Sequence, residues 1–323
     1  MIRIGTRDSA LALWQARYVK QVLEDAGNPC EICFIKTEGD LVLDTPLPLM
    51  GGKGVFTKAL DEALLNKKID IAVHSLKDIP TRLPDQLVIG AVTQRGDHRD
   101  VLVCRQTAQL FFEHEGDARA IPKERNIQWV SESGAYTIAS SSNRRIGQWL
   151  SRYPKSHIVD IRGNVQTRLK KLAESQWTAA IFAAAGLQRL GLEVLVDEYL
   201  DWMIPAPAQG AIGVMAREED HRIIEKLSLV HDEETALCTQ IERDVLQVLE
   251  GGCSAPVGAY ALVKEGEVAV VVSTVYPDGK NQNLLQLARP LKEAHSLGEE
   301  AAEKALKLGA DKLIEYLKRT TNL

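Results

Sequence analysis

The sequence predicts an α/β fold in which parallel strands are joined by helices. Strand patterns at 2–5, 30–35 and 69–73 alternate with two segments whose apolar residues recur at helical spacing. The pattern over 69–73 is apolar on both faces, which is typical of a strand that helices cover on both sides. A length of 323 residues exceeds a single core, so we expect two or three domains.

The first third of the chain supplies one α/β unit. Asp8 or Ser9 can cap a helix that runs to Glu24, and Gly27 can end it. A loop rich in Gly, Asp and Pro follows the second strand, and a helix with apolar positions from Val55 to Leu64 leads to the third. After a fourth strand at 87–92, the polar stretch 93–100 is predicted to connect two domains.

The remaining segments predict a second α/β unit and a terminal domain. Residues 105–136 are polar and show no clear periodicity, so we expect an elaborated surface segment there. A Pro-rich stretch at 204–210 is a second predicted connector. The other expected elements are strands at 101–104, 138–140, 157–161, 179–183, 211–216, 257–263 and 267–275, and helices at 143–150, 165–174, 218–229, 232–249 and 296–319, the last interrupted at Gly309.

Composition and charge exclude several classes of function. The net charge of −5 gives no general reason to expect nucleic-acid binding. No apolar run approaches the roughly 20 residues that span a bilayer, so no membrane partner is expected. The N-terminus begins directly in a strand pattern without a signal peptide, which predicts a cytoplasmic protein.

The cysteines indicate neither a disulfide framework nor a metal site. They are few and odd in number: Cys30, Cys33, Cys104, Cys238 and Cys253. Cys30 and Cys33 have the spacing of a redox pair, but in a strand their thiols would point to opposite faces. No His, Cys or carboxylate cluster has zinc spacing, so we expect no metal.

Arginines recur beside small residues just after the predicted strands. They are Arg7, Arg144, Arg145, Arg162, Arg168 and Arg189. Free backbone N–H groups at helix N-termini bind anions, and Arg adds bidentate contacts to carboxylate or phosphate. Six unrelated surface ion pairs are the alternative, but the shared position favours one basic cleft. Its ligand would be a polyanion; no Walker motif and no interleaved aromatics are present, so a polycarboxylate fits at least as well as a nucleotide or nucleic acid.

Two further positions carry candidate chemistry. Lys77 and Asp78 directly follow the strand at 69–73, and ligands of open α/β sheets bind beyond the carboxyl ends of strands. A solvated turn is the alternative, but a carboxylate among cations would stay ionised and could stabilise a cationic intermediate. Cys253 follows two glycines after a predicted helix, so it is either an accessible nucleophile or attachment point, or a small buried residue.

Eight motifs occur along the chain in an order that is specific in combination. They are Gly5-Thr6-Arg7-Asp8-Ser9, Gly51-Gly52-Lys53-Gly54-Val55-Phe56, His74-Ser75-Leu76-Lys77-Asp78-Ile79-Pro80, Ser141-Ser142-Asn143-Arg144-Arg145, Arg162-Gly163-Asn164-Val165, Ala183-Ala184-Ala185-Gly186-Leu187, Gln209-Gly210-Ala211 and Glu250-Gly251-Gly252-Cys253. Over essentially its whole length the chain resembles the hydroxymethylbilane synthase (porphobilinogen deaminase) family. Four places depart from the family pattern without removing a charged or nucleophilic group: Asn143, Pro207-Ala208, Ser254-Ala255 and the segment 105–136, which is longer than the family pattern.

The resemblance implies a fold and a set of domain boundaries. Two lobes would resemble those of periplasmic binding proteins, with the second inserted in the first, and a smaller C-terminal α+β domain would follow. Domain 1 would comprise 1–95 and 208–228, domain 2 would comprise 96–207, and the cofactor-attachment domain would comprise 229–323. The family also implies a monomer.

The resemblance further implies a transferase of tetrapyrrole and haem biosynthesis. It would join four porphobilinogen molecules head to tail onto a dipyrromethane cofactor held covalently by Cys253, release ammonia and, after hydrolysis, free hydroxymethylbilane. Asp78 matches the catalytic residue. Matching cofactor contacts are Lys77, Ser142, Arg144, Arg145 and Arg168. Matching substrate contacts are Arg7, Ser9, Arg162, Arg189, Ser141, Phe56 and Lys53, with Gln15 a further candidate and His74 structural. A non-catalytic polyanion-binding protein is the alternative; it would need the arginines but neither Asp78 nor Cys253.

Overall fold

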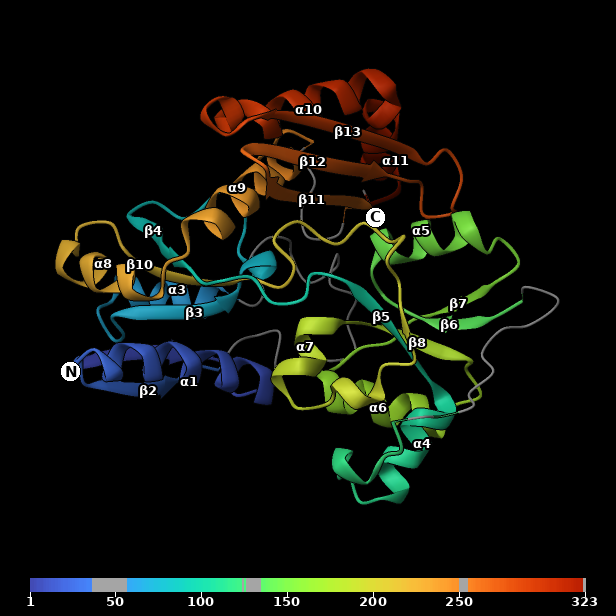
Figure 1. Ribbon diagram of the computed structural model, residues 1–323, viewed down its shortest axis with the longest axis horizontal. Helices are drawn as coiled ribbons and strands as arrows, with labels where there is room; N and C mark the ends of the chain where they lie inside the picture. Colours follow the sequence, from blue (N-terminus) through green and yellow to red (C-terminus); the bar gives the residue numbers. More distant parts are fainter. Residues whose placement is uncertain (37–56, 124, 126–134, 250–254, 322–323) are drawn as a thin grey trace.

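The computed structural model describes residues 1–36, 57–123, 125, 135–249 and 255–321. Lys53, Phe56 and Cys253 lie outside the described residues, so their predicted roles are not tested. Within the described part the strands form three sheets (Figure 1). None of the described helices has the length and apolar character needed to cross a bilayer.

The two five-stranded sheets share one topology. The first has the order β2-β1-β3-β10-β4 and the second the order β7-β6-β8-β5-β9. In each sheet the first three strands are parallel, and the fourth runs antiparallel to both of its neighbours. The first sheet comprises β1 (Ile2–Thr6), β2 (Cys30–Phe34), β3 (Ile71–Ser75), β4 (Leu87–Val92) and β10 (Ile212–Arg217). The second comprises β5 (Asp100–Cys104), β6 (Thr137–Ala139), β7 (His157–Val159), β8 (Ala179–Ala183) and β9 (Glu198–Tyr199).

The helices that follow these strands cover two lobes, each with its own apolar core. Lobe 1 carries α1 (Ala10–Asp25), α3 (Lys58–Leu65), the short 3₁₀ turn η2 (Leu76–Asp78) and α8 (His221–Leu227). Lobe 2 carries α4 (Arg105–Glu113), α5 (Asn143–Arg152), α6 (Val165–Glu174) and α7 (Ala184–Arg189). The chain leaves lobe 1 after β4 and returns to it through β10, so the second lobe is inserted in the first, as expected.

The C-terminal part forms a smaller α+β domain. Its antiparallel sheet contains β11 (Val257–Lys264), β12 (Glu267–Thr274) and β13 (Asn283–Pro290). Helices α9 (Glu233–Val248) and α10 (Leu297–Ala305) pack on this sheet, and α11 (Asp311–Thr321) ends the described chain. As predicted, Asp232 caps α9, accepting from Thr235 N–H at 2.8 Å. Gly309, at φ 107°, breaks the terminal helical stretch at the predicted position.

Two sequence predictions were wrong. Residues 105–136 are not only surface: α4 buries Thr107, Ala108 and Phe111, and the latter two belong to the core of lobe 2. Its apolar stripe is narrow and is flanked by polar residues, which hid the helical period. Strand β13 was not predicted either: its residues alternate in exposure, but exposed Leu284 is apolar and partly buried Arg289 is polar, so the residue types do not alternate.

Candidate active site

The predicted site residues follow equivalent strands in the two lobes. Arg7 and Ser9 follow β1, and Ser141, Ser142 and Arg144 follow β6, the strand that corresponds to β1. The same holds for Lys77 and Asp78 after β3, and for Arg189 after β8. Since these are the carboxyl ends of parallel strands, both sheets present their ligand-binding edges. The helices that follow β1 and β8 meet, since Arg189 of α7 lies over the Trp14 ring of α1 at 5.8 Å.

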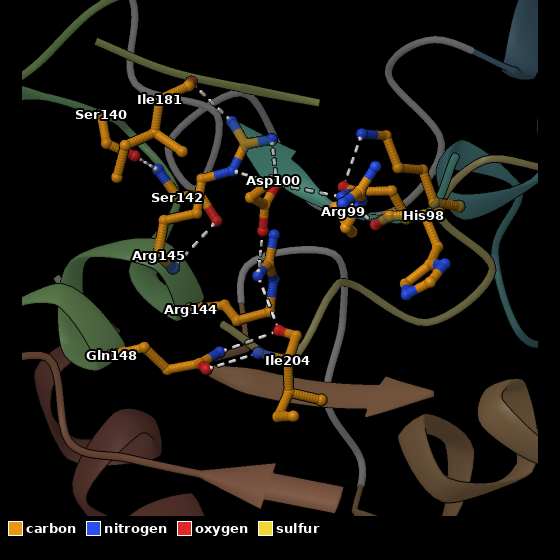
Figure 2. A network of polar contacts seen from close by, with 12 residues as sticks. His98, Arg99, Asp100, Ser140, Ser142, Arg144, Arg145, Gln148, Ile181 and Ile204 are labelled. Carbon is orange, nitrogen blue, oxygen red and sulfur yellow. Dashed lines mark hydrogen bonds and ion pairs between the residues drawn. The ribbon is translucent and has the colours of Figure 1, made fainter. Parts of the chain in front are cut away.

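Asp100 is the centre of the charge network at this junction (Figure 2). Its carboxylate accepts from Arg144 at 2.6 Å and from two nitrogens of Arg145 at 2.7 and 3.0 Å. Both guanidinium groups also donate to backbone carbonyls, that of Ile204 for Arg144 and that of Ile181 for Arg145. Burial alone would raise the pKa of Asp100, but the two arginines hold it well below its usual range. Arg144 and Arg145 thus hold the start of β5, strand β8 and the second connector together.

Lys77 and Asp78 lie on the short turn η2. A Cβ at Gly213 of β10 would lie 2.8 Å from the Leu76 side chain and 2.7 Å from the Ile79 side chain, so the glycine lets β10 approach the turn and the residue after it closely. The Lys77 ammonium donates to Oε1 of Gln209 at 3.2 Å. Burial lowers the pKa of Lys77 to about 8, which Asp78 partly opposes.

Arg168 on α6 brings a further cation to the same place. Burial lowers its pKa to about 10, and the charges of Arg145 and Asp78 both act on it. Its guanidinium lies over the Phe182 ring at 5.0 Å. The buried Nε–H groups of Arg168 and Arg144 have no hydrogen-bond partner among the described residues. Buried donors of this kind are rare, so the two groups mark places where an acceptor would be favoured.

The balance of charge at the junction is positive. Among the described side chains, four cations, Lys77, Arg144, Arg145 and Arg168, act with two carboxylates, Asp78 and Asp100. In a partly buried site this excess favours an anionic ligand, and the unpartnered Nε–H groups fit carboxylate oxygens.

The other predicted arginines lie along the same edges. Arg189 donates to the carbonyl of Gly210, and burial lowers its pKa to about 10. Arg162 donates to Asp160 at 3.2 Å and keeps 21% of its side chain exposed. Arg7 is half-buried and lies near enough to His74 to influence the pKa of that histidine.

The predicted serines make local structural contacts. Ser9 caps α1 and Ser142 caps α5. The Ser141 hydroxyl donates to the carbonyl of Ile161 at 2.6 Å and so ties the loop after β6 to the loop after β7. Gln15 is buried and donates to Ser75 at 2.8 Å, directly before the turn η2. Burial lowers the pKa of His74 to about 4, which fits a neutral structural histidine.

Sequence reasoning gave no role to the residues that join the domains. Glu242 of α9 is fully buried and bonds both connectors: it pairs with Arg95 at 2.6 Å and accepts from Ala208 N–H at 2.6 Å. Glu242 also accepts from Ala261 N–H of β11 at 2.7 Å. Ala208, one of the positions that depart from the family pattern, has φ 63°. This left-handed conformation costs a non-glycine residue about 1–2 kcal/mol, and Ala208 nevertheless adopts it in the second connector.

Arg243, the next residue of α9, reaches the segment that follows the turn η2. It donates to the carbonyls of Ile79 at 2.9 Å and Pro80 at 2.7 Å. One signal was available in the sequence, since Glu242 lies on the same helical face as the apolar residues Cys238 and Val245.

Comparisons with known proteins agree with this geometry. The model of the porphobilinogen deaminase dipyromethane cofactor binding domain matches residues 2–225, and that of the C-terminal domain matches 236–307. The porphobilinogen deaminase of Desulforamulus reducens is 40% identical over 322 residues, covering 98% of each chain. That of Pelobacter propionicus is 39% identical over 318 residues, covering 97% of this chain and 96% of the relative. The chain belongs to the porphobilinogen deaminase family.

Among solved structures, the methionine binding protein MetQ is similar over 73% of this chain and 91% of its own, at 13% identity and a TM-score of 0.40. A score this low has no bearing on function.

The cofactor of the porphobilinogen deaminase family fits the junction of the lobes. The matched cofactor binding domain contains every described cation of the site. A dipyrromethane made from porphobilinogen carries carboxylates on both rings, and these are the acceptors that the excess of guanidinium N–H groups favours. Arg144, Arg168 and Lys77 are the residues that would hold it.

Proposed function

We propose that the chain condenses four porphobilinogen molecules head to tail on a dipyrromethane attached to Cys253 and, after hydrolysis, releases hydroxymethylbilane. The observation that supports this proposal is the cation cluster around the Lys77–Asp78 turn, in which two guanidinium N–H groups have no partner within the described part of the chain. When bound, dipyrromethane would supply the free pyrrole carbon to which each new unit is joined. We further propose a cytoplasmic monomer with domain boundaries near 95, 207 and 228.

The arginines bind and orient the substrate in this proposal. Porphobilinogen carries an acetate and a propionate, and guanidinium groups bind carboxylates through paired hydrogen bonds. Arg7, Arg162 and Arg189 lie along the two sheet edges beyond the central cluster, so they would hold the carboxylates of incoming and growing pyrroles. Ser9 and Ser141, and the undescribed Lys53 and Phe56, are proposed to assist them.

Asp78 is proposed to stabilise positive charge. Loss of ammonia from porphobilinogen leaves an electron-poor azafulvenium, and carbon–carbon bond formation leaves a cationic pyrrole that then loses a proton. The Asp78 carboxylate beside the pyrrole N–H groups would stabilise both cations and could accept that proton. The cations around Asp78 hold the ligand carboxylates, which separates binding from charge stabilisation.

The mass of the denatured protein tests the proposal. After expression with porphobilinogen available, the protein should carry a covalent adduct of two pyrrole units, and Cys253→Ser should lose it. Cys33→Ser is the matched control, since Cys33 is a free thiol in strand β2 and its loss should leave the adduct in place. An unmodified wild-type mass would instead favour a non-catalytic polyanion-binding protein.

A further inference from the structure

The side-chain amide of Gln209 is held in one orientation. Gln209 lies in the second connector and is 1% exposed. Its Nε2 donates to Oδ1 of Asp100 at 2.9 Å and to the carbonyl of His98 at 2.8 Å. An ionised carboxylate and a carbonyl can only accept hydrogen bonds, so the amide nitrogen must face them. The amide oxygen therefore faces the opposite side.

The opposite side is occupied by Lys77. The ammonium of Lys77 donates to Oε1 of Gln209 at 3.2 Å, across 132 positions of sequence. Lys77 lies on lobe 1 beside Asp78, whereas Asp100 begins β5 of lobe 2. Gln209 thus joins a cation of one lobe to the charge network of the other.

We propose that Gln209 is a positioning residue: it holds the Lys77 ammonium at the junction of the lobes, where Lys77 presents its charge to a carboxylate of the bound pyrroles. The identity of that ligand rests on the proposed function. The orientation of the amide and its contact with Lys77 rest on the chain itself.

The charges around Lys77 predict the direction in which its pKa should change when Gln209 is replaced. The charged groups that face Lys77 are Asp78 on its own turn, Arg144 and Arg145 on α5, and Asp100 on β5. Burial already lowers the pKa of Lys77 to about 8. The oxygen of Gln209 accepts from the charged form of Lys77 and so favours it. Removing that acceptor should lower the pKa further.

Gln209→Met and Gln148→Met form a matched pair of variants. Gln148 is also a buried amide, 1% exposed, and also bonds the second connector. Its partners are the N–H and the carbonyl of Ile204, at 2.8 and 2.9 Å. Each variant removes a buried amide of the same size from the same region, and only the first removes the acceptor of Lys77.

The measurement is competitive acetylation of the purified holoenzyme with acetic anhydride across a pH series, with Lys77 quantified by peptide mass spectrometry. A hydrogen bond to a charged group corresponds to about one to two pKa units, so Gln209→Met should lower the titration midpoint of Lys77 by about one unit. Gln148→Met should leave it unchanged. In Gln209→Met, the alkaline limb of the pH profile of kcat/KM should shift together with the titration midpoint of Lys77. In a Lys77→Arg background, adding Gln209→Met should leave that limb unchanged.

An unchanged midpoint in Gln209→Met, or an equal shift in both variants, would overturn the proposal. If Gln209→Met does not fold, Gln209→Asn keeps the amide but is one methylene too short to reach both sides, and a downward shift is expected there too. The labelling does not depend on turnover. A wild-type protein without adduct or activity would therefore refute the proposed function and leave the result on Lys77 standing.

Discussion

Glu242→Gln should strongly destabilise the fold, because Glu242 joins three parts of the chain. Each carboxylate oxygen of Glu242 accepts two hydrogen bonds. Oε1 accepts from Arg95 and from the N–H of Ala261, and Oε2 accepts from Arg95 and from the N–H of Ala208. An amide nitrogen at either position cannot accept. The variant leaves the guanidinium of Arg95, whose side chain is 12% exposed, without its counter-charge and turns a backbone N–H toward a donor.

The expected magnitude follows from burial. Removing one partner of a buried ion pair costs about 3–5 kcal/mol of unfolding free energy. With the unfolding entropy expected for a chain of 323 residues, this corresponds to a fall in melting temperature of roughly 4–7 °C. Differential scanning calorimetry of the holoenzyme measures it.

The control is a set of ion pairs in the same domain with exposed partners. Glu300 pairs with Arg289 and Lys304, and the side chains of Glu300, Arg289 and Lys304 are 30%, 38% and 43% exposed. Each such pair contributes about 0–1 kcal/mol, so Glu300→Gln should lower the melting temperature by less than roughly 3 °C. Equal melting temperatures for Glu242→Gln and Glu300→Gln would show that the buried pair does not hold the connectors.

Two further variants test the role of Asp78 and the titration of His98 in the first connector. Asp78→Asn should keep the melting temperature and nearly abolish turnover, because it removes only the charge that stabilises cationic pyrroles; near-normal steady-state rates would refute that role. Burial lowers the pKa of His98 to about 4, against about 6.5 in an unfolded chain, so stability present above pH 6.5 is lost as the pH falls towards 4. His98→Phe keeps the ring stacked on Tyr260 but removes the titration, so thermal melting at pH 7 and pH 5 should show a smaller loss than in wild type, and an equal loss would contradict the assignment.

The sequence predicted what local chemistry determines. Ser9 and Asp232 are helix caps with a short-range signature, and the kink at Gly309 follows from a residue that tolerates positive φ. The recurrence of Arg after strands also predicted cations that the structure brings close together, since Arg144 and Arg145 act on Lys77 and Arg145 acts on Arg168.

The residues that sequence reasoning missed depend on partners that are distant in the chain. Asp100 looks like an ordinary polar residue of a connector until Arg144 and Arg145 are placed around it, 44 and 45 positions later. Glu242 and Arg95 are separated by 147 positions. A buried charge is tolerated only through such long-range pairing, and a local pattern does not identify the partner.

The position of β10 in the first sheet favours an order of assembly during synthesis. Lobe 2 has all of its strands once residue 199 has been made, whereas lobe 1 lacks β10, which separates β3 from β4. Until residue 217 leaves the ribosome, β4 has no neighbour in its sheet and the edge of β3 stays unpaired. The inserted lobe can therefore close first on the nascent chain, and the lobe that begins the sequence is completed only after it.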